Sequence, residues 1–422
     1  MSRKLIAFII ILTLFSFLVR FYRLSEPDRY NFDEVYHVVT AKGYAANNPA
    51  AYDPFAPPPE EKTAYDWLHP PLVKLIQAAF IRSLGDEPEF WRLPSTVFGA
   101  AVIPAVFILA FILFGPVVAV LSALAIAFEN LNLVMSRIAM NDVFLVFFVV
   151  VSFVFAVLYG RSGKIKFLVG TSIFLGFAIA SKWTGVYAIL VICGYVLYLD
   201  LKIRKLKVQS SLLVVIPALI YLSSYGQFWL QGHSLKEFVD LHKQIWQYQN
   251  RHDLSHPYGT TSVFCVPGGL DGPKTFCPWA LDVRPVYFSF EQYGERAGYI
   301  YALGNPLVYW FGLGTVIYLA GNFWKEERKS TVALVMAGYF IFWVPWIFSP
   351  RILFMYHFLP STPFLAIAIG YVLSQLWKRS RVLVVVIVAM LAASFFYFYP
   401  VTSGFPIKTS DIDNYMWLPS WR

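Results

Sequence analysis

The sequence predicts an all-α protein that crosses a membrane many times, with about 11 transmembrane helices and two large loops on one side. Of its 422 residues, 58% are hydrophobic and only 14% are charged, and the mean hydropathy is +0.57. Soluble domains carry roughly 25% charged residues. Aromatic residues make up 18% of the chain, as expected where Trp and Tyr anchor helices at membrane interfaces. Composition therefore places the chain in a bilayer.

Apolar runs long enough to cross a ~30 Å hydrocarbon core recur along nearly the whole chain. The first run, Leu5–Val19, leads into Arg20-Phe21-Tyr22-Arg23 and not into a small-residue cleavage site, so we expect an uncleaved span. The runs near 116–134 and 167–181 are short or interrupted. The predicted spans are 5–22, 93–114, 116–134, 143–160, 167–181, 184–200, 208–226, 304–323, 331–349, 358–376 and 382–399.

Charge predicts how these spans are oriented. With the N-terminus inside, five short segments become cytoplasmic: 1–4, 161–166, 200–207, 325–329 and 378–381. They hold 15 Lys/Arg and 3 acids, which leaves 19 Lys/Arg and 22 acids elsewhere. Short basic loops on one side follow the positive-inside rule. The net charge of +9 is therefore a property of topology and does not indicate a nucleic-acid partner.

Three regions follow from this topology. Residues 1–230 form an N-terminal transmembrane module with a first outer loop at 23–92. Residues 231–303 form a second outer loop, and residues 304–422 form a C-terminal region of four spans with an outer tail. Cys265 and Cys277 lie in the second outer loop, where an oxidising exterior favours a disulfide over two free thiols. No ligand spacing typical of a metal site accompanies them.

Two adjacent carboxylates, Asp33 and Glu34, follow the first span. A solvated acid pair without function is the simpler interpretation of so short a motif. On the predicted topology, however, further polar clusters lie on the same outer side, where snorkelling cations or helix caps would explain each one alone. They are 66–74, 136–142, 181–185, Arg351 and Tyr356-His357. Together they predict one outward-facing cavity lined by the acid pair and several cations.

Such a cavity suits a defined chemistry. Arg and Lys can hold the phosphate of a lipid, and a nearby carboxylate can accept a proton from an incoming hydroxyl. The cations would stabilise charge that grows on the leaving phosphate. The residues therefore fit transfer of a group from a lipid phosphate to an alcohol.

A helix is predicted from Leu72 to Leu84, because Pro70 and Pro71 suit a helix start. Its apolar residues share one face, and Lys74, Gln77 and Arg82 interrupt the opposite face. This pattern is typical of an amphipathic helix on a membrane surface. Such a helix could border the entry path of a lipid substrate, or it could be a plain surface helix.

Ordered motifs add a family resemblance. The matching stretches are Arg20–Leu24 with Phe32–His37, His69–Lys74, Ser136-Arg137 with Asp142, Ser181–Gly185, His256–Tyr258, Cys277–Tyr287, Leu303–Pro306 and Phe354–Pro360. In this order, over about residues 18–365, they resemble the dolichyl-phosphate-mannose–protein mannosyltransferases, which are glycosyltransferases of the GT-C fold. Eukaryotic members carry a MIR domain in the second loop, and this loop is too short for one. The resemblance is therefore to a prokaryotic-type member in the cell membrane, or in the endoplasmic reticulum membrane if the source is eukaryotic.

The resemblance implies roles for individual residues. The donor would be polyprenyl-phosphate mannose, and the acceptor a Ser or Thr hydroxyl of an exported protein. Asp33 matches the proposed general base, with Glu34 as a helper that positions acceptor or sugar. Arg137, Lys182, Arg351 and, with less support, Lys74 would contact the donor phosphate or lipid, and His69, Asp142, Tyr356 and His357 would position acceptor or sugar. No essential cofactor or metal is implied, and family members can pair as dimers.

Two other functions stay open on the sequence. A related GT-C enzyme could move another sugar, such as aminoarabinose, from a polyprenyl phosphate to a lipid or polysaccharide. The second-loop motifs and Phe354–Pro360 favour protein mannosylation, because they lie outside the generic acidic motif. A transporter would place charges near the midplane and show internal repeats, neither of which the sequence shows.

Overall fold

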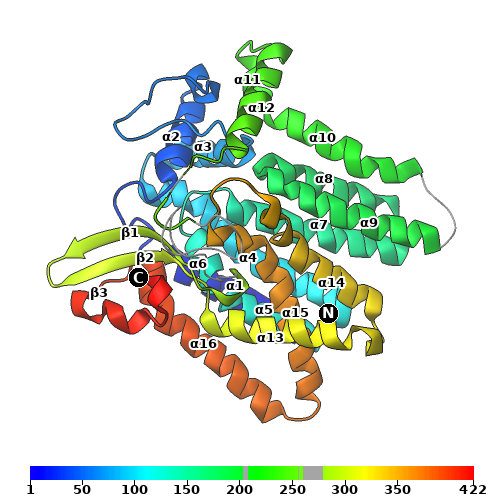
Figure 1. The fold of residues 1–422 in the computed structure, drawn as a ribbon. Coiled ribbons are helices and arrows are strands. Elements are labelled where there is room, and N and C mark those ends of the chain that lie inside the picture. The colour runs from blue at the N-terminus through cyan, green and yellow to red at the C-terminus, as the bar shows by residue number, and fades with distance from the viewer. Residues whose placement is uncertain (203–207, 255, 260–278) are drawn as a thin grey trace.

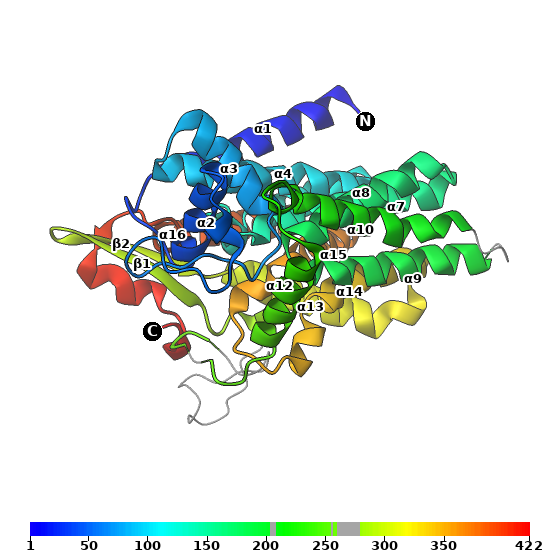
Figure 2. The same cartoon turned by 90° about the horizontal axis from the view of Figure 1, so that it is seen from above.

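A computed structural model describes residues 1–202, 208–254, 256–259 and 279–422. Most of its long helices run side by side between two ends of the molecule, and the chain termini lie toward opposite ends (Figures 1 and 2). The α-helices are α1 (Arg3–Phe21), α2 (Glu34–Ala45), α3 (Leu72–Leu84), α4 (Pro88–Phe114), α5 (Pro116–Ala127), α6 (Asn130–Met135), α7 (Asp142–Ser162), α8 (Ile165–Ser181), α9 (Val186–Lys202), α10 (Leu212–Ser224), α11 (Gly226–Leu230), α12 (Leu235–Gln249), α13 (Pro306–Asn322), α14 (Lys329–Ile341), α15 (Thr362–Trp377) and α16 (Arg381–Ser403). The 3-10 helices are η1 (Pro49–Tyr52), η2 (Trp183–Gly185), η3 (Val208–Ser211), η4 (Trp279–Leu281), η5 (Phe323–Lys325), η6 (Val344–Phe348), η7 (Met355–Ser361), η8 (Thr409–Tyr415) and η9 (Pro419–Trp421).

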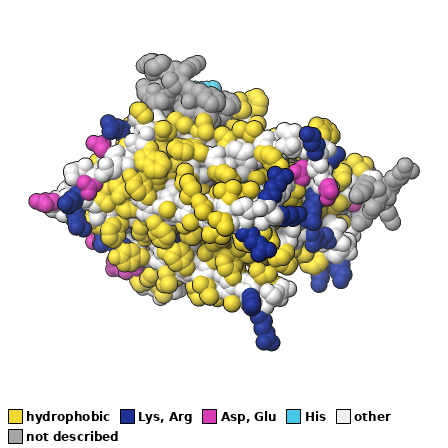
Figure 3. Space-filling model, turned by 90° about the horizontal axis from the view of Figure 1, so that it is seen from below, with side chains coloured by type: hydrophobic (Ala, Val, Ile, Leu, Met, Phe, Trp, Pro, Cys, Tyr) yellow, Lys and Arg dark blue, Asp and Glu magenta, His cyan; other side chains and the backbone are white. Residues whose placement is uncertain are grey.

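The protein is a multi-pass membrane protein. Among the described residues, eight helices are long and apolar enough to cross a membrane, and three shorter apolar helices accompany them at 116–127, 165–181 and 209–224. Each predicted span overlaps one of these helices. In the view of Figure 3, hydrophobic side chains cover the middle of the molecule, and Lys and Arg gather toward the end where α9 finishes in Figure 1.

The predicted span 116–134 is wrong in its second half. α5 ends at Ala127, and α6 begins as a separate, fully buried helix at Asn130. The cause is Glu129, whose carboxylate accepts hydrogen bonds from the backbone N–H groups of Leu131 and Asn132 at 2.8 and 2.6 Å. A side chain that caps the first N–H groups starts a new helix.

α5 and α15 pack closely because a glycine lies between them. A Cβ atom at Gly370 of α15 would meet the Oγ atom of Ser122 at 2.2 Å and the carbonyl oxygen of Val118 at 2.8 Å. Small residues allow such close approach of helix backbones within membranes. This contact joins the N-terminal and C-terminal halves of the bundle.

One end of the molecule carries α2, α3 and a small sheet (Figures 1 and 2). α3 has the predicted limits, and on the side opposite its apolar residues Lys74 and Gln77 are buried in the protein. The sheet was not predicted. Antiparallel strands β1 (Val286–Tyr293) and β2 (Arg296–Ala302) form a hairpin, and β3 (Ile407–Lys408) from the C-terminal tail pairs with β2.

Candidate active site

Asp33 lies at the N-cap of α2, half-buried, at the end of the molecule that carries the loops. Its carbonyl oxygen accepts from the N–H of His37 at 3.0 Å, and side chains four residues apart share a helix face. Burial raises the pKa of Asp33 to about 6, with opposing contributions from the charges of His37, Asp66, Lys182 and Asp142. A carboxyl that titrates near neutrality can act as a general base.

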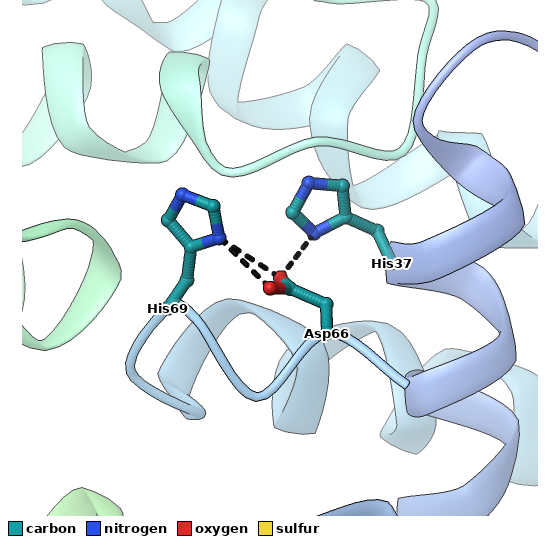
Figure 4. A group of neighbouring side chains, drawn as sticks. All are labelled: His37, Asp66 and His69. Atoms are coloured by element: carbon teal, nitrogen blue, oxygen red, sulfur yellow. Dashed lines mark hydrogen bonds and ion pairs between the residues drawn. The ribbon is translucent and has the colours of Figure 1, made fainter. Parts of the chain in front are cut away.

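Asp66 is the centre of a buried polar network beneath this helix (Figure 4). It lies 2.9 Å from Nδ1 of His37 and 3.0 Å from Nδ1 of His69, and it accepts from Nζ of Lys74 at 2.6 Å. Burial alone would raise the pKa of Asp66, but His69, Lys74 and His37 hold it well below its usual range. Burial lowers the pKa of His69 to about 4, so this ring is neutral at neutral pH.

The same residues have the spacing of a metal site. Among the described residues, the Nδ1 atoms of His37 and His69 and an oxygen of Asp66 lie within 4.8 Å of one another. Lys74 argues against a cation at this point. Its ammonium group already neutralises Asp66 and donates to the carbonyl oxygens of Asp66 and His69 at 2.9 and 3.2 Å. The group is better described as a network of ion pairs and hydrogen bonds centred on Asp66.

Lys182 and Asp142 form an ion pair of 2.9 Å between two membrane helices. Asp142 is the first residue of α7, and Lys182 lies in the extended break between α8 and η2. Nζ of Lys182 is 5.9 Å from the centre of the Tyr356 ring. Tyr356 also lies close enough to Asp33, Asp142 and Arg351 for their charges to act on its hydroxyl group. These predicted site residues therefore lie near one another.

Arg351 supplies a second cation to this group. Its Nη1 donates to Oε1 of Gln249, and its guanidinium lies 6.0 Å from the centre of the Tyr248 ring. Its buried Nε–H has no partner within the described part of the chain. An unpaired buried donor is costly, and a ligand oxygen would satisfy it. The adjacent His357 ring stacks on Trp346, with ring centres 4.8 Å apart, and lies near Lys182, Arg351 and His69.

Glu34 points away from this group of residues. Its carboxylate forms a two-point ion pair with Arg92 at 2.8 and 2.9 Å, and both side chains are 0% exposed. It also accepts from the N–H groups of Asn31 and Ala139 at 2.8 and 2.9 Å. With these partners Glu34 ties the first outer loop to the start of α4 and to the turn before α7.

Arg137 is also fully engaged with the protein. Its guanidinium donates to the backbone carbonyls of Arg20, Tyr22, Arg23 and Ser403. Four carbonyl partners use both of its terminal nitrogens, which favours a role in holding the end of α1 over contact with a phosphate. Cys265 and Cys277 lie outside the described residues.

Three residues at the site were not selected from the sequence: His37, Asp66 and Arg92. His37 could have been found from its spacing of four from Asp33 if a helix had been predicted over residues 34–45. Asp66 and His69 are three residues apart before Pro70, which is a local signal for a turn. Arg92 gave no signal, because its partner Glu34 lies 58 residues away.

Two sequence models of one protein family match this chain. A sequence model of the family described as dolichyl-phosphate-mannose-protein mannosyltransferase matches residues 10–232. A second model, the C-terminal four-transmembrane region of protein O-mannosyltransferase, matches residues 234–421. The chain is 26% identical to the polyprenol-phosphate-mannose–protein mannosyltransferases of Mycobacterium tuberculosis and Corynebacterium glutamicum, over 84% of this chain and 81% of each relative.

Solved structures share the fold. The Saccharomyces cerevisiae protein O-mannosyltransferase Pmt1–Pmt2 complex, bound to its sugar donor, matches with a TM-score of 0.81 at 14% identity, over 100% of this chain and 93% of that chain. ArnT from Cupriavidus metallidurans, bound to undecaprenyl phosphate, matches with a TM-score of 0.58 at 16% identity, over 92% and 64%. The family models cover the chain almost from end to end, and it therefore belongs to the dolichyl-phosphate-mannose–protein mannosyltransferase family, as a glycosyltransferase of the GT-C fold.

Proposed function

We propose that the chain transfers mannose from polyprenyl-phosphate mannose to Ser and Thr hydroxyls of exported proteins, with inversion at the anomeric carbon. The observation that carries this proposal is one accessible carboxylate, Asp33, grouped with the two cations Lys182 and Arg351 around Tyr356. Membership of the mannosyltransferase family supports the choice of sugar, and its relatives are named for the same donor and for protein acceptors.

The proposed reaction is a single displacement. The acceptor oxygen attacks the anomeric carbon while the bond from that carbon to the phosphate oxygen breaks. The proton of the hydroxyl passes to Asp33, and the electron pair of the broken bond stays on the polyprenyl phosphate, which gains one negative charge. A base with a pKa near 6 is ionised at neutral pH and still accepts a proton effectively in the transition state.

In this proposal Lys182 and Arg351 hold the donor phosphate. Arg351 has a buried Nε–H without a partner in the described part of the chain, and Lys182, paired with Asp142, lies 5.9 Å from the centre of the Tyr356 ring. Fixed cations stabilise charge that develops on a leaving group. We assign Lys74, whose three donors are used, and Arg137, whose partners are carbonyls, to holding the fold.

The remaining polar residues would position acceptor and sugar. His69 keeps 22% of its side chain exposed beside the Asp66 network, which lets it meet an acceptor hydroxyl. Asp142, Tyr356 and His357 surround Lys182 on the donor side. Glu34 would act on Asp33 only indirectly, because its carboxylate is fully occupied by Arg92 and two backbone N–H groups.

In this proposal the site faces outward from a prokaryotic cell membrane. The basic segments of the sequence support the outward side, and the bacterial relatives support the prokaryotic membrane. An outward site matches a donor carried on a membrane lipid and an acceptor that has been exported. A dimer is part of the proposal only by analogy, since the yeast structure that shares the fold is a complex of two related chains.

Transfer of another sugar to a lipid is the alternative. The likeness to ArnT rests on fold, with 64% of that chain covered, whereas the mannosyltransferase family models match residues 10–232 and 234–421. The comparison therefore favours protein mannosylation.

Mass spectrometry of exported proteins tests acceptor and sugar together. Cells that carry the native chain should show hexose on Ser and Thr residues that is absent when the chain carries Asp33→Asn. Asp28→Asn is a matched control, because Asp28 is an exposed acid of the same loop. Unchanged hexose in the Asp33→Asn cells, or loss of a sugar from lipid alone, would overturn the proposal.

A further inference from the structure

The residue before Asp33 has an unusual backbone. Phe32 adopts a φ of +51°, in the left-handed region that glycine favours and that a bulky residue rarely enters. Strained residues of this kind persist only where the surrounding structure imposes them, and they cluster at functional sites. Phe32 immediately precedes the proposed base, Asp33.

Aromatic side chains from distant segments surround the Phe32 ring. Phe288 of β1 stacks on it, with ring centres 4.3 Å apart and an interplanar angle of 19°. Three further rings meet it edge-on at 6.1 to 6.2 Å, namely His256, Phe354 and Tyr356. We call these four residues the aromatic clamp. Stacked and edge-on pairs are attractive beyond the area they bury.

The hairpin that carries Phe288 is fastened to the same loop by polar contacts. Arg29 donates to the carbonyl oxygen of Phe290 at 2.8 Å and forms an ion pair with Glu291 at 2.8 Å. The hydroxyl of Tyr293 donates to Glu26 at 2.8 Å. Strand β1 is therefore docked along residues 26–32, so the position of Phe288 over Phe32 is not an isolated ring contact.

The turn at Phe32 fixes the start of α2. The N–H of Glu34 donates to the carbonyl oxygen of Asn31 at 3.0 Å, and the N–H of Asn31 donates to the Glu34 carboxylate at 2.8 Å. These bonds close a small loop around Phe32 and Asp33. A different φ at Phe32 would break this loop and turn Asp33 away from Lys182 and His37.

We propose that the aromatic clamp holds Phe32 in its left-handed conformation and so aims Asp33 at the acceptor hydroxyl, with Phe288 as a positioning residue from the second outer loop. This role deepens the proposed function and rests on it, since it takes Asp33 as the base. It also assigns a purpose to the hairpin, whose Phe288 meets the ring of the site residue Tyr356 edge-on at 6.1 Å.

The first test compares glycine with alanine at Phe32. Both substitutions remove the ring, but only glycine accepts the left-handed backbone without strain. Phe32→Gly should therefore unfold at a higher temperature and turn over faster than Phe32→Ala. Phe55 is the matched control, because it is a 78% exposed phenylalanine in the same loop with an ordinary φ. At this control position Phe55→Gly should be no more stable than Phe55→Ala. The proposal would be overturned if Phe32→Gly were likewise no more stable than Phe32→Ala.

The second test removes the stacking partner. Phe288→Ala should lower kcat by at least about tenfold and leave the KM for the donor within about twofold, because small displacements of a reacting group are costly. Phe288→Leu, which still covers the Phe32 ring, should restore most of the turnover. The control is Phe290→Ala in the same strand, since Phe290 packs on Tyr299. Native kcat in Phe288→Ala, or equal loss in Phe290→Ala, would contradict the positioning role.

Failure of this inference is distinguishable from failure of the proposed function. If Asp33→Asn turns over normally, the proposed base is wrong, whereas the order of thermal stability at Phe32 still reports the backbone strain. If Asp33→Asn is inactive and Phe288→Ala is fully active, the base stands and the clamp does not position it.

Discussion

At the scale of single residues, the two adjacent acids have opposite environments. Asp33 is half-buried among other charges and keeps an accessible surface, whereas Glu34 is fully buried and paired with Arg92. A buried ion pair adds little net stability, but removal of one partner leaves an uncompensated charge. Asp33 is therefore the acid available for the proposed chemistry, and Glu34 holds the structure.

Substitution of each acid by its amide should separate these roles. Glu34→Gln leaves Arg92 buried without its counter-charge and should cost about 3–5 kcal/mol of stability. Asp33→Asn should not lower the unfolding temperature at pH 8. The folded state raises the pKa of Asp33, so its ionisation costs stability as pH rises from the ordinary value through about 6, and Asn removes that cost. The unfolding temperature in detergent is the measurement. Equal decreases for Glu34→Gln and Asp33→Asn would contradict the separate roles of the two acids.

The pH dependence of transfer follows from the same carboxyl. Asp33 accepts a proton only when ionised, so kcat/KM should fall as pH drops through about 6 and approach a tenfold loss for each further unit. The charges that face Asp33 are His37, Asp66, Lys182 and Asp142, and each contributes to this midpoint. A rate that stays constant from pH 7.5 to about 5 would contradict a base of this kind.

At the scale of elements, the contact between α5 and α15 offers a comparison of two glycines. Gly370→Ala places a Cβ against the backbone of Val118 and should cost about 1–3 kcal/mol, as overpacking does. Gly314 of α13 has no atom within 4 Å of its added Cβ, so Gly314→Ala should be neutral or slightly stabilising. Unfolding temperatures in the same detergent provide the measurement. Equal effects of the two substitutions would argue against close packing at Gly370.

Local patterns predicted the membrane helices well, because apolar runs are a property of consecutive residues. Each predicted span overlaps an apolar helix, and the helix 72–84 has its predicted limits. The helix break at Glu129 was not predicted, because the sequence does not show that this carboxylate caps the backbone N–H groups of Leu131 and Asn132. The pattern placed Lys74 opposite the apolar residues of this helix, but it could not show that this side is buried, where Asp66 neutralises Lys74.

Long-range partners explain the rest of what sequence did not predict. The small sheet depends on β3, which lies 105 residues beyond the end of β2. The environment of Glu34 depends on Arg92, and that of Arg137 on carbonyls from both ends of the chain. The positive-inside rule predicted that the cations and acids lie on the outer side of the membrane. The sequence did not show which of them form ion pairs within the protein.

At the scale of the whole molecule, orientation in the membrane is the main prediction. The basic segments predict that 325–329 lies in the cytoplasm and the first outer loop outside. With the three native cysteines replaced by serine, Glu327→Cys should resist a membrane-impermeant thiol reagent in intact cells. Glu61→Cys, at a side chain that is 89% exposed, should react. The reverse labelling pattern would invert the topology and place the proposed site in the cytoplasm.

The central claim is that Asp33 removes the acceptor proton during sugar transfer, and turnover by Asp33→Asn tests it most directly. Membranes with the native chain, Asp33→Asn or the control Asp28→Asn would receive radiolabelled polyprenyl-phosphate mannose and an acceptor peptide. We predict that Asp33→Asn transfers at least about 10²-fold less label, as loss of a general base entails, at a protein level equal to the native chain. Near-native transfer by Asp33→Asn, with Asp28→Asn unchanged, would contradict the account.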